Sequence, residues 1–162
     1  MIQAKLKIDA GMFRKHAKAV GTKVIPFERI AFKKFAVEAY RAVKMYTPPT
    51  RSGRTKIKDL WKMEFSRRGT IESYIIKNIY PNQDVILWME EGTQPHIIRP
   101  KKPGGVLAWM DEDTGKAMFA KLVHHPGTPA YRMVYHAERE MNIRINYYIQ
   151  QTFKMVDRVT RG

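Results

Sequence analysis

The clearest hydrophobic pattern in the chain is helical and occupies two long segments. Across residues 27–46, apolar side chains recur at spacings of three and four, which places them on one side of a helix: Phe32, Phe35, Ala36, Ala39, Val43 and Tyr46. Residues 128–159 show the same spacing: Tyr131, Val134, Met141, Ile145, Tyr148, Ile149, Phe153 and Val156. Pro48 predicts the end of the first helix. Thr128 and Pro129 predict the cap and first position of the second.

Ahead of and between these helices, the pattern is typical of strands. Residues 2–8 alternate apolar and polar side chains, which predicts a half-buried strand, and a short helix is predicted over residues 10–20. The segments 70–80 and 84–90 are rich in β-branched and aromatic residues. We interpret them as two strands of a hairpin joined by residues 81–83.

A second hairpin is predicted further along the chain. Residues 106–110 and 116–123 are apolar and flank an acidic turn at 111–115, and residues 96–100 favour a short extended piece before it. The order of elements predicts one α+β domain over residues 1–162. In it, a small, largely antiparallel β-sheet is packed by a long helix from the N-terminal half and a long C-terminal helix.

The charge of the chain is strongly positive, at +15 with 30 Lys+Arg against 15 Asp+Glu. Residues 1–60 hold fifteen basic and four acidic groups, so most of the surplus is N-terminal. We expect a mobile basic loop near 49–57, followed by an ordered segment. The basic side chains there are candidate contacts for DNA or an acidic partner, or merely solvate the surface: Arg51, Arg54, Lys56, Lys58, Lys62, Arg67 and Arg68.

This basic segment contains no motif for sequence-specific DNA recognition. No zinc finger or recognition-helix motif accompanies the basic residues, so any DNA contact is expected to be non-specific. Trp61 and Phe65 could stack on bases, but their positions favour a place in the core.

Motifs of catalysis are missing from the sequence. There is no cysteine, no H-E-x-x-H pair, no G-x-S-x-G elbow and no phosphate-binding glycine loop. Adjacent His124 and His125 would point to opposite faces of a strand, so they could share a metal ion, as in a metal hydrolase, only if Pro126-Gly127 kinked the chain. The longest apolar run, residues 85–89, is far too short to span a bilayer. We therefore expect no enzyme, cofactor, metal or membrane segment, and a protein made in the cytoplasm.

Two short sequence blocks each bring histidine, glycine and proline close together. "WMEEGTQPHIIRPKK" spans residues 88–102, and "LVHHPGTPAY" spans 122–131. Gly92 permits a sharp turn, and Thr93 can hydrogen-bond the local backbone. The two blocks supply the candidate assembly loops: Glu90, Gly92, Thr93, His96, Pro100, His125, Pro126 and Gly127.

In their order and spacing, these motifs resemble the neck or tail-completion proteins of long-tailed bacteriophages. The matching features are a helix that ends at a proline before a Ser-Gly turn, an E-x-G-T-x-x-H-x-I-x-P block, and an H-P-G-T block that leads into a closing helix. The likeness covers roughly residues 27–157. The family often has Asp before the turn, whereas Arg51 precedes it here.

The resemblance implies a structural virion protein without enzymatic activity, which joins the DNA-filled head to the tail. It implies a homo-oligomeric ring, a hexamer or dodecamer, next to the head-closure protein, the tail terminator and the tail tube proteins. Genomic DNA or the tape measure in the channel is a further expected contact. The expected location is the virion neck or tail top, and the host cytoplasm during assembly. The alternative from the residues is a non-specific nucleic-acid-binding protein that uses segment 51–68.

Overall fold

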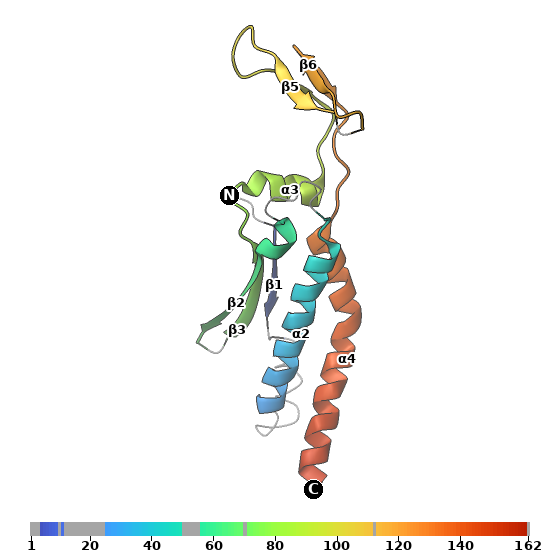
Figure 1. Cartoon of the computed structure of the whole chain (residues 1–162). Helices are drawn as coiled ribbons and strands as arrows, with labels where there is room; N and C mark the ends of the chain where they lie inside the picture. The colour runs from blue at the N-terminus through green and yellow to red at the C-terminus, as the bar shows by residue number, and fades with distance from the viewer. Residues whose placement is uncertain are drawn as a thin grey trace.

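The structure is a computed structural model, and it describes residues 4–9, 11, 25–49, 56–69, 71–111 and 113–161. The short helix predicted over residues 10–20 and most of the predicted basic loop, including Arg51 and Arg54, lie outside this part of the chain. The fold is α+β, as predicted, with a small antiparallel sheet beside two long helices (Figure 1). None of the described helices has the length and apolar character needed to cross a bilayer.

The two long helices, α2 (Ile25–Tyr46) and α4 (Met133–Arg161), run antiparallel along one another (Figure 1). Phe27 at the start of α2 packs against Val156 near the end of α4. The apolar stripe predicted for α2 is confirmed, because all of its members are buried except half-buried Tyr46. Ala36 and Ala39 are fully buried in this stripe, and their small side chains allow the helices to approach closely.

A three-stranded antiparallel sheet packs one face against the helices. Its order is β1-β3-β2, with β1 (Lys5–Asp9) and β2 (Trp61–Arg68) on either side of β3 (Ile71–Asn78). A short 3₁₀ turn, η2 (Ile57–Leu60), leads into β2. Trp61 is fully buried with Ile76, so its predicted place in the core is confirmed, but the core position predicted for Phe65 is wrong because that side chain is mostly exposed.

The predicted strand at residues 84–90 is wrong, because the structure has a helix there, α3 (Gln83–Glu91). Asn82 is the N-cap, and its side chain accepts a hydrogen bond from Asp84 N at 3.1 Å. Gly92 closes the helix with a positive φ of 76°. A short apolar run does not distinguish strand from helix, and residues 81–83, predicted to form a hairpin turn, contain the cap.

The closing helix begins later than predicted. Thr128 and Pro129 are not its cap and first residue, since α4 starts at Met133. Thr128 forms an isolated bridge with Thr93 instead, and Arg132, with a φ of 51°, turns the chain into the helix. Instead of being helical, the backbone of residues 128–132 forms hydrogen bonds with the end of α3 and with Thr93, which follows that helix.

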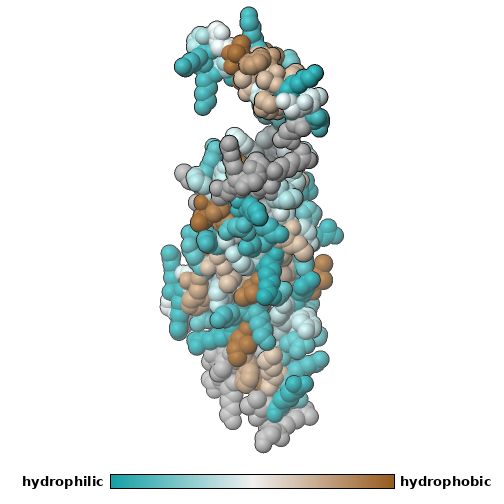
Figure 2. Space-filling view, viewed as in Figure 1, coloured by the Kyte–Doolittle hydropathy of each residue, from teal (hydrophilic) through white to brown (hydrophobic). Residues whose placement is uncertain are grey.

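Two short ribbons in series project from one end of this body, and we call residues 96–125 the arm (Figure 1). The first ribbon pairs β4 (His96–Ile98) with β7 (Val123–His125). The second pairs β5 (Leu107–Met110) with β6 (Ala117–Ala120), which confirms the predicted hairpin. Figure 2 shows brown and tan apolar side chains gathered over this outer hairpin, away from the body.

Candidate functional site: the junction and the arm

The junction between body and arm brings the two sequence blocks together. Thr93 and Thr128 exchange two backbone hydrogen bonds, Thr93 N to Thr128 O at 2.9 Å and the reverse at 3.2 Å. Next to them, His96 lies opposite His125 in the β4–β7 ribbon. Residues some thirty positions apart therefore form one antiparallel joint, and this joint fixes where the arm begins.

Two glycines make this close approach possible. Gly92 has a φ of 76°, and a Cβ there would lie 2.5 Å from Thr128 O. Gly127 has a φ of 89°, and a Cβ there would collide with Thr93 O. Both neighbours are backbone atoms, which cannot move aside as a side chain could. The sharp turn predicted at Gly92 is confirmed. Glycine is required there because the φ is positive and also because the backbone of Thr128 lies so close.

Glu90 ties α3 to the start of α4. Its carboxylate accepts hydrogen bonds from Val134 N at 3.0 Å and from Tyr135 N at 3.1 Å. Its backbone carbonyl accepts from Arg132 N at 3.2 Å. A helix N-terminus leaves free N–H groups and carries partial positive charge, so a carboxylate is a favourable cap there. The sequence predicts a local cap at Thr128, and nothing in the local pattern indicates one supplied from 44 residues away.

Thr93 also acts at long range. Its hydroxyl oxygen accepts a hydrogen bond from Thr128 N at 2.9 Å, so the local backbone contact predicted for it is replaced by one across the junction. The side chain and the backbone of Thr93 thus hold the same residue of the second block.

The histidines of the two blocks stack on each other at the base of the arm. The rings of His96 and His125 lie 5.0 Å apart between centroids, at an angle of 29°. His125 Nδ1 accepts a hydrogen bond from Gly127 N at 3.1 Å, and His96 Nδ1 lies 2.8 Å from Gln94 O. No group of three possible metal ligands gathers among the described residues. The geometry assigns the pair to holding the joint, and their stacking could not be read from the sequence.

Pro100 and Pro126 lie at the two ends of the inner β4–β7 ribbon. Pro126 lies directly between His125 and Gly127, and Pro100 follows β4 by two residues. Neither residue can donate a backbone hydrogen bond, so each limits how far the inner ribbon extends.

The outer hairpin of the arm is apolar on both faces. Side chains alternate along each strand, and the register places Leu107 and Trp109 with Ala120 and Met118 on one face. The opposite face has Ala108, Met110, Ala117 and Phe119. Phe119 is 67% exposed and Met110 62% exposed. The neighbouring elements of the body leave both faces open to solvent.

At the tip of the hairpin, hydrogen bonds hold the acidic side chain of Asp111 in place. Asp111 accepts hydrogen bonds from the backbone N and the hydroxyl of Thr114, at 2.8 and 2.7 Å. These hydrogen bonds lower the pKa of Asp111, so its carboxylate stays charged. Asp113 is exposed beside it. The tip is therefore negative, although the chain as a whole is strongly positive.

A row of lysines crosses the open face of the three-stranded sheet. Lys5 and Lys62 both lie opposite Lys77, one on each side, and exposed Lys7 follows on β1. Lys77 forms an ion pair with Glu64 at 2.9 Å. Like charges directly opposite one another weaken a sheet, so such a row suits contact with an anionic partner.

The basic residues predicted as contacts divide between different places. Lys62 joins the lysine row, whereas Lys56 and Lys58 are exposed before β2 and Arg68 is exposed at its end. Arg67 instead contacts Glu72, at 3.8 Å from Nε to Oε1. Lys5 and Lys7, which complete the row, lie more than fifty residues before Lys62. Strand pairing was required to find them.

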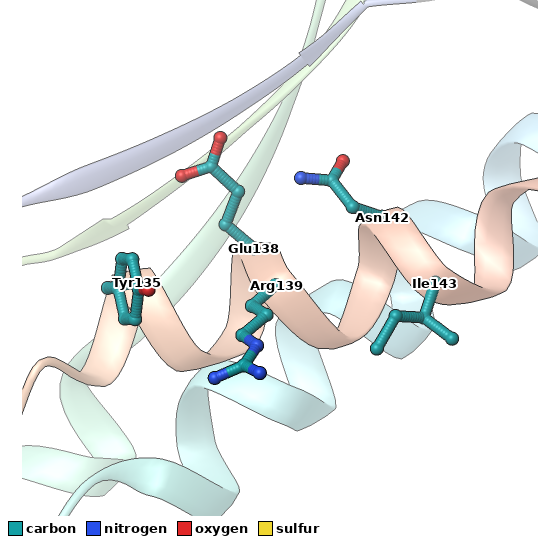
Figure 3. A pocket seen from close by; sticks show the side chains of 5 residues that line it. All are labelled: Tyr135, Glu138, Arg139, Asn142 and Ile143. Atoms are coloured by element: carbon teal, nitrogen blue, oxygen red, sulfur yellow. The ribbon is translucent and has the colours of Figure 1, made fainter.

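A shallow groove, largely open to solvent, runs along α4 on the side that carries its exposed residues. It has a volume of about 690 Å³ and is lined by Tyr135, Glu138, Arg139, Asn142 and Ile143. Figure 3 shows Glu138 and Asn142 on one side, with Arg139 and Ile143 on the other. The members of each row are four residues apart, as in the ridges that helices use for packing. This groove lies on the body, and no motif in the sequence pointed to it.

Comparison of the chain with protein-family models, curated proteins and solved structures gives no match.

Proposed function

We propose that this protein is a structural subunit of the neck or tail top of a long-tailed phage. In this role it completes the tail and joins it to the DNA-filled head. The observation that carries the proposal is the junction: the two blocks of the resemblance, distant in sequence, meet there and hold an apolar arm away from the body. The resemblance suggests the kind of assembly, and the junction provides a physical reason for both blocks.

The chemistry of the arm supports an assembly role over that of an isolated subunit. A two-stranded hairpin is only marginally stable alone in water. This one also exposes Trp109, Met110 and Phe119 to solvent. Large apolar groups gathered on one projection mark an interaction site. Neighbouring subunits, together with the head-closure, tail-terminator or tail tube proteins, would cover these side chains in the virion.

Quantitative mass spectrometry of purified phage particles tests the proposal. We expect this chain at a small fixed ratio to the major capsid protein, on the scale of one ring per particle. Its absence from finished particles would overturn the proposal. The lysine row makes nucleic-acid binding the second candidate.

For that candidate, the decisive measurement is DNA affinity as a function of salt. If the row binds phosphates, replacing Lys5, Lys7 and Lys62 with Gln should weaken binding and reduce the salt slope by about 0.9 for each phosphate no longer neutralised. Replacing Lys101, Lys102 and Lys121 of the arm removes the same charge elsewhere and serves as the control. Equal effects of the two triple replacements would show only a general charge effect.

A further inference from the structure

The outer hairpin lacks a core of its own, and the groove on α4 has the complementary chemistry. Tyr135 and Ile143, in the same row as Arg139, give one side of the groove an apolar character, and Ile143 is 75% exposed. Tyr147, also exposed, continues the row of residues four apart. The apolar faces of the hairpin could bury their side chains against such a row, as ridges pack into grooves.

Charge favours the same pairing. The tip of the hairpin presents Asp111 and Asp113, while Arg139 lines the groove and Arg132 stands over the ring of Tyr135, 5.9 Å from its centroid. Glu138 on the opposite rim is the one acidic residue that lines the groove in the part of the chain that the structure describes. It would repel an acidic tip placed beside it and so favours the arginine side.

We infer that the outer hairpin of one subunit docks in the α4 groove of a second copy of this chain. Trp109 and Phe119 would fill the apolar part, and the acidic tip would lie beside Arg139. Because the two surfaces differ, the contact is heterologous, and repeating it closes a ring if the rotation allows. The inference rests on the proposed function for the ring, and it specifies which surfaces join one subunit to the next.

The position of the arm suits this exchange. The junction holds the arm at the N-terminal end of α4 through Glu90, Gly92 and Gly127, so its direction is fixed relative to the groove of the same subunit. A fixed angle between the donor and acceptor surfaces is what a closed ring of identical subunits requires.

The test uses two defective variants and their mixture. The arm variant is Trp109→Ser with Phe119→Ser, and the groove variant is Arg139→Glu with Ile143→Glu. Each should reduce self-association by roughly 30-fold or more, because exposed aromatic and arginine anchors carry most of the affinity at interfaces. Each variant retains one intact surface, so an equimolar mixture should form dimers that grow no further. Sedimentation velocity distinguishes monomers, dimers and rings.

Controls separate this contact from loss of folding. Trp88→Ser removes a tryptophan of α3 that is 50% exposed, against 41% for Trp109, and Ile30→Glu places a charge at an exposed isoleucine of α2. Both should assemble as the unchanged protein does. Circular dichroism should show unchanged helix content in all the variants, since every substituted side chain is exposed or lies outside the core.

Three outcomes would overturn the inference: normal assembly of either defective variant, a mixture that remains monomeric, or an unchanged chain that stays monomeric at high concentration. The first two would leave the proposed function standing, with another surface closing the ring. The third would assign the arm to a different protein of the virion. If the mixture forms dimers but the chain is absent from purified particles, the docking contact stands and the proposed function is overturned.

Discussion

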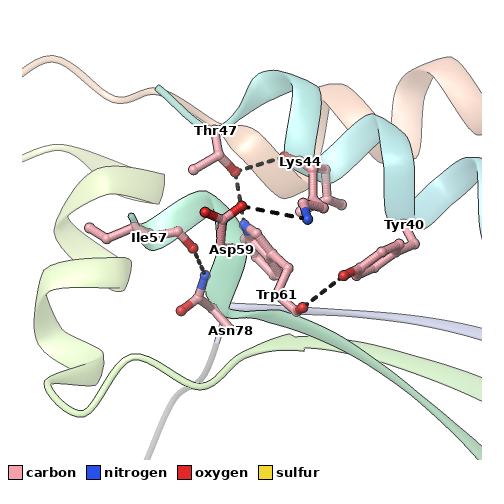
Figure 4. A network of polar contacts seen from close by, with 8 residues as sticks. Tyr40, Lys44, Thr47, Ile57, Asp59, Trp61 and Asn78 are labelled. Carbon is pink, nitrogen blue, oxygen red and sulfur yellow. Dashed lines mark hydrogen bonds and ion pairs between the residues drawn. The ribbon is translucent and has the colours of Figure 1, made fainter. Parts of the chain in front are cut away.

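The body and the arm use similar residues in opposite ways. Trp61 of the body is fully buried, and its indole Nε1 donates to Thr47 Oγ1 at 2.8 Å (Figure 4). The hydroxyl of Thr47 in turn donates to Val43 O, also at 2.8 Å. Trp109 of the arm is 41% exposed on a two-stranded ribbon. One tryptophan completes a core, whereas the other is available to a partner.

This difference shows how stability is distributed. The body buries its apolar side chains between the sheet, α2, α3 and α4. The arm depends on short ladders, turns and the junction, so its apolar residues contribute little to the folding of an isolated subunit. Exposed apolar residues gathered on one projection are typical of an interaction surface.

Replacing each tryptophan with alanine should have the largest and most unequal effects. Trp61→Ala should lower the free energy of unfolding by about 3–5 kcal/mol, because it leaves a core cavity. Trp109→Ala should change it by no more than about 0.5 kcal/mol in the monomer. Urea denaturation of dilute protein measures both. Similar destabilisation at the two sites would contradict the division between body and arm.

The junction should be nearly as sensitive as the core. Gly127→Ala should cost at least about 3 kcal/mol, because the added Cβ meets Thr93 O at a positive φ. Gly104→Ala is the matched control: its φ is 76°, but no atom of the described residues lies within 4 Å of the position that the new methyl group would take, so it should cost only about 1–2 kcal/mol. Thermal unfolding compares the two, and equal shifts would mean that close approach does not matter.

Removal of the carboxylate that caps α4 should have an intermediate effect. Glu90→Ala removes the acceptor for Val134 N and Tyr135 N, and we expect a destabilisation of about 1–2 kcal/mol. Exposed Glu91 is its neighbour, and Glu91→Ala removes the same charge with little effect on stability. If the two variants have the same melting temperature, the Glu90 cap contributes nothing to stability. The attachment of the arm must then depend on the Thr93–Thr128 bridge.

Alkaline pH should produce the smallest effect, and only in the body. Burial raises the pKa of Tyr74 and of Tyr148, with Glu72 and Glu38 respectively adding to the shift. The unfolded chain therefore releases these protons first. Their contribution is fully present below the unfolded pKa of 10.0 and disappears as pH rises through the folded value. Tyr148→Phe should make the melting temperature less sensitive to pH above 10; an unchanged pH profile would argue against this residue.

Much of the body could be predicted from sequence, because each long helix carries its own periodic pattern. The α2 stripe followed from the spacing of its apolar residues, and the sharp turn at Gly92 from the chemistry of turns. In the arm, the β5–β6 hairpin followed from two apolar segments on either side of an acidic turn. The strand predicted at residues 84–90 is wrong, because a short apolar run fits the periodicity of a strand and that of a helix equally well. Asn82, the N-cap of α3, lies within the hairpin turn predicted at residues 81–83.

The contacts between distant segments could not be predicted. Glu90 caps a helix 44 residues away, and Lys5 meets Lys77 only because β1 pairs with β3. In the sequence, the residues that line the α4 groove resemble any solvent-facing side of a helix. They become a candidate surface only in the structure, where their side chains lie in two exposed rows.

Hydrogen exchange at protein concentrations below and above assembly would decide whether the arm is ordered by its partners. The backbone amides of residues 107–120 are compared with those of residues 31–43 in α2. We predict that the arm segment exchanges rapidly in the dilute monomer and becomes protected on assembly, while the α2 segment is protected throughout. An arm already as protected as α2 in the monomer, or one that gains no protection on assembly, would contradict the division between a self-sufficient body and a partner-dependent arm.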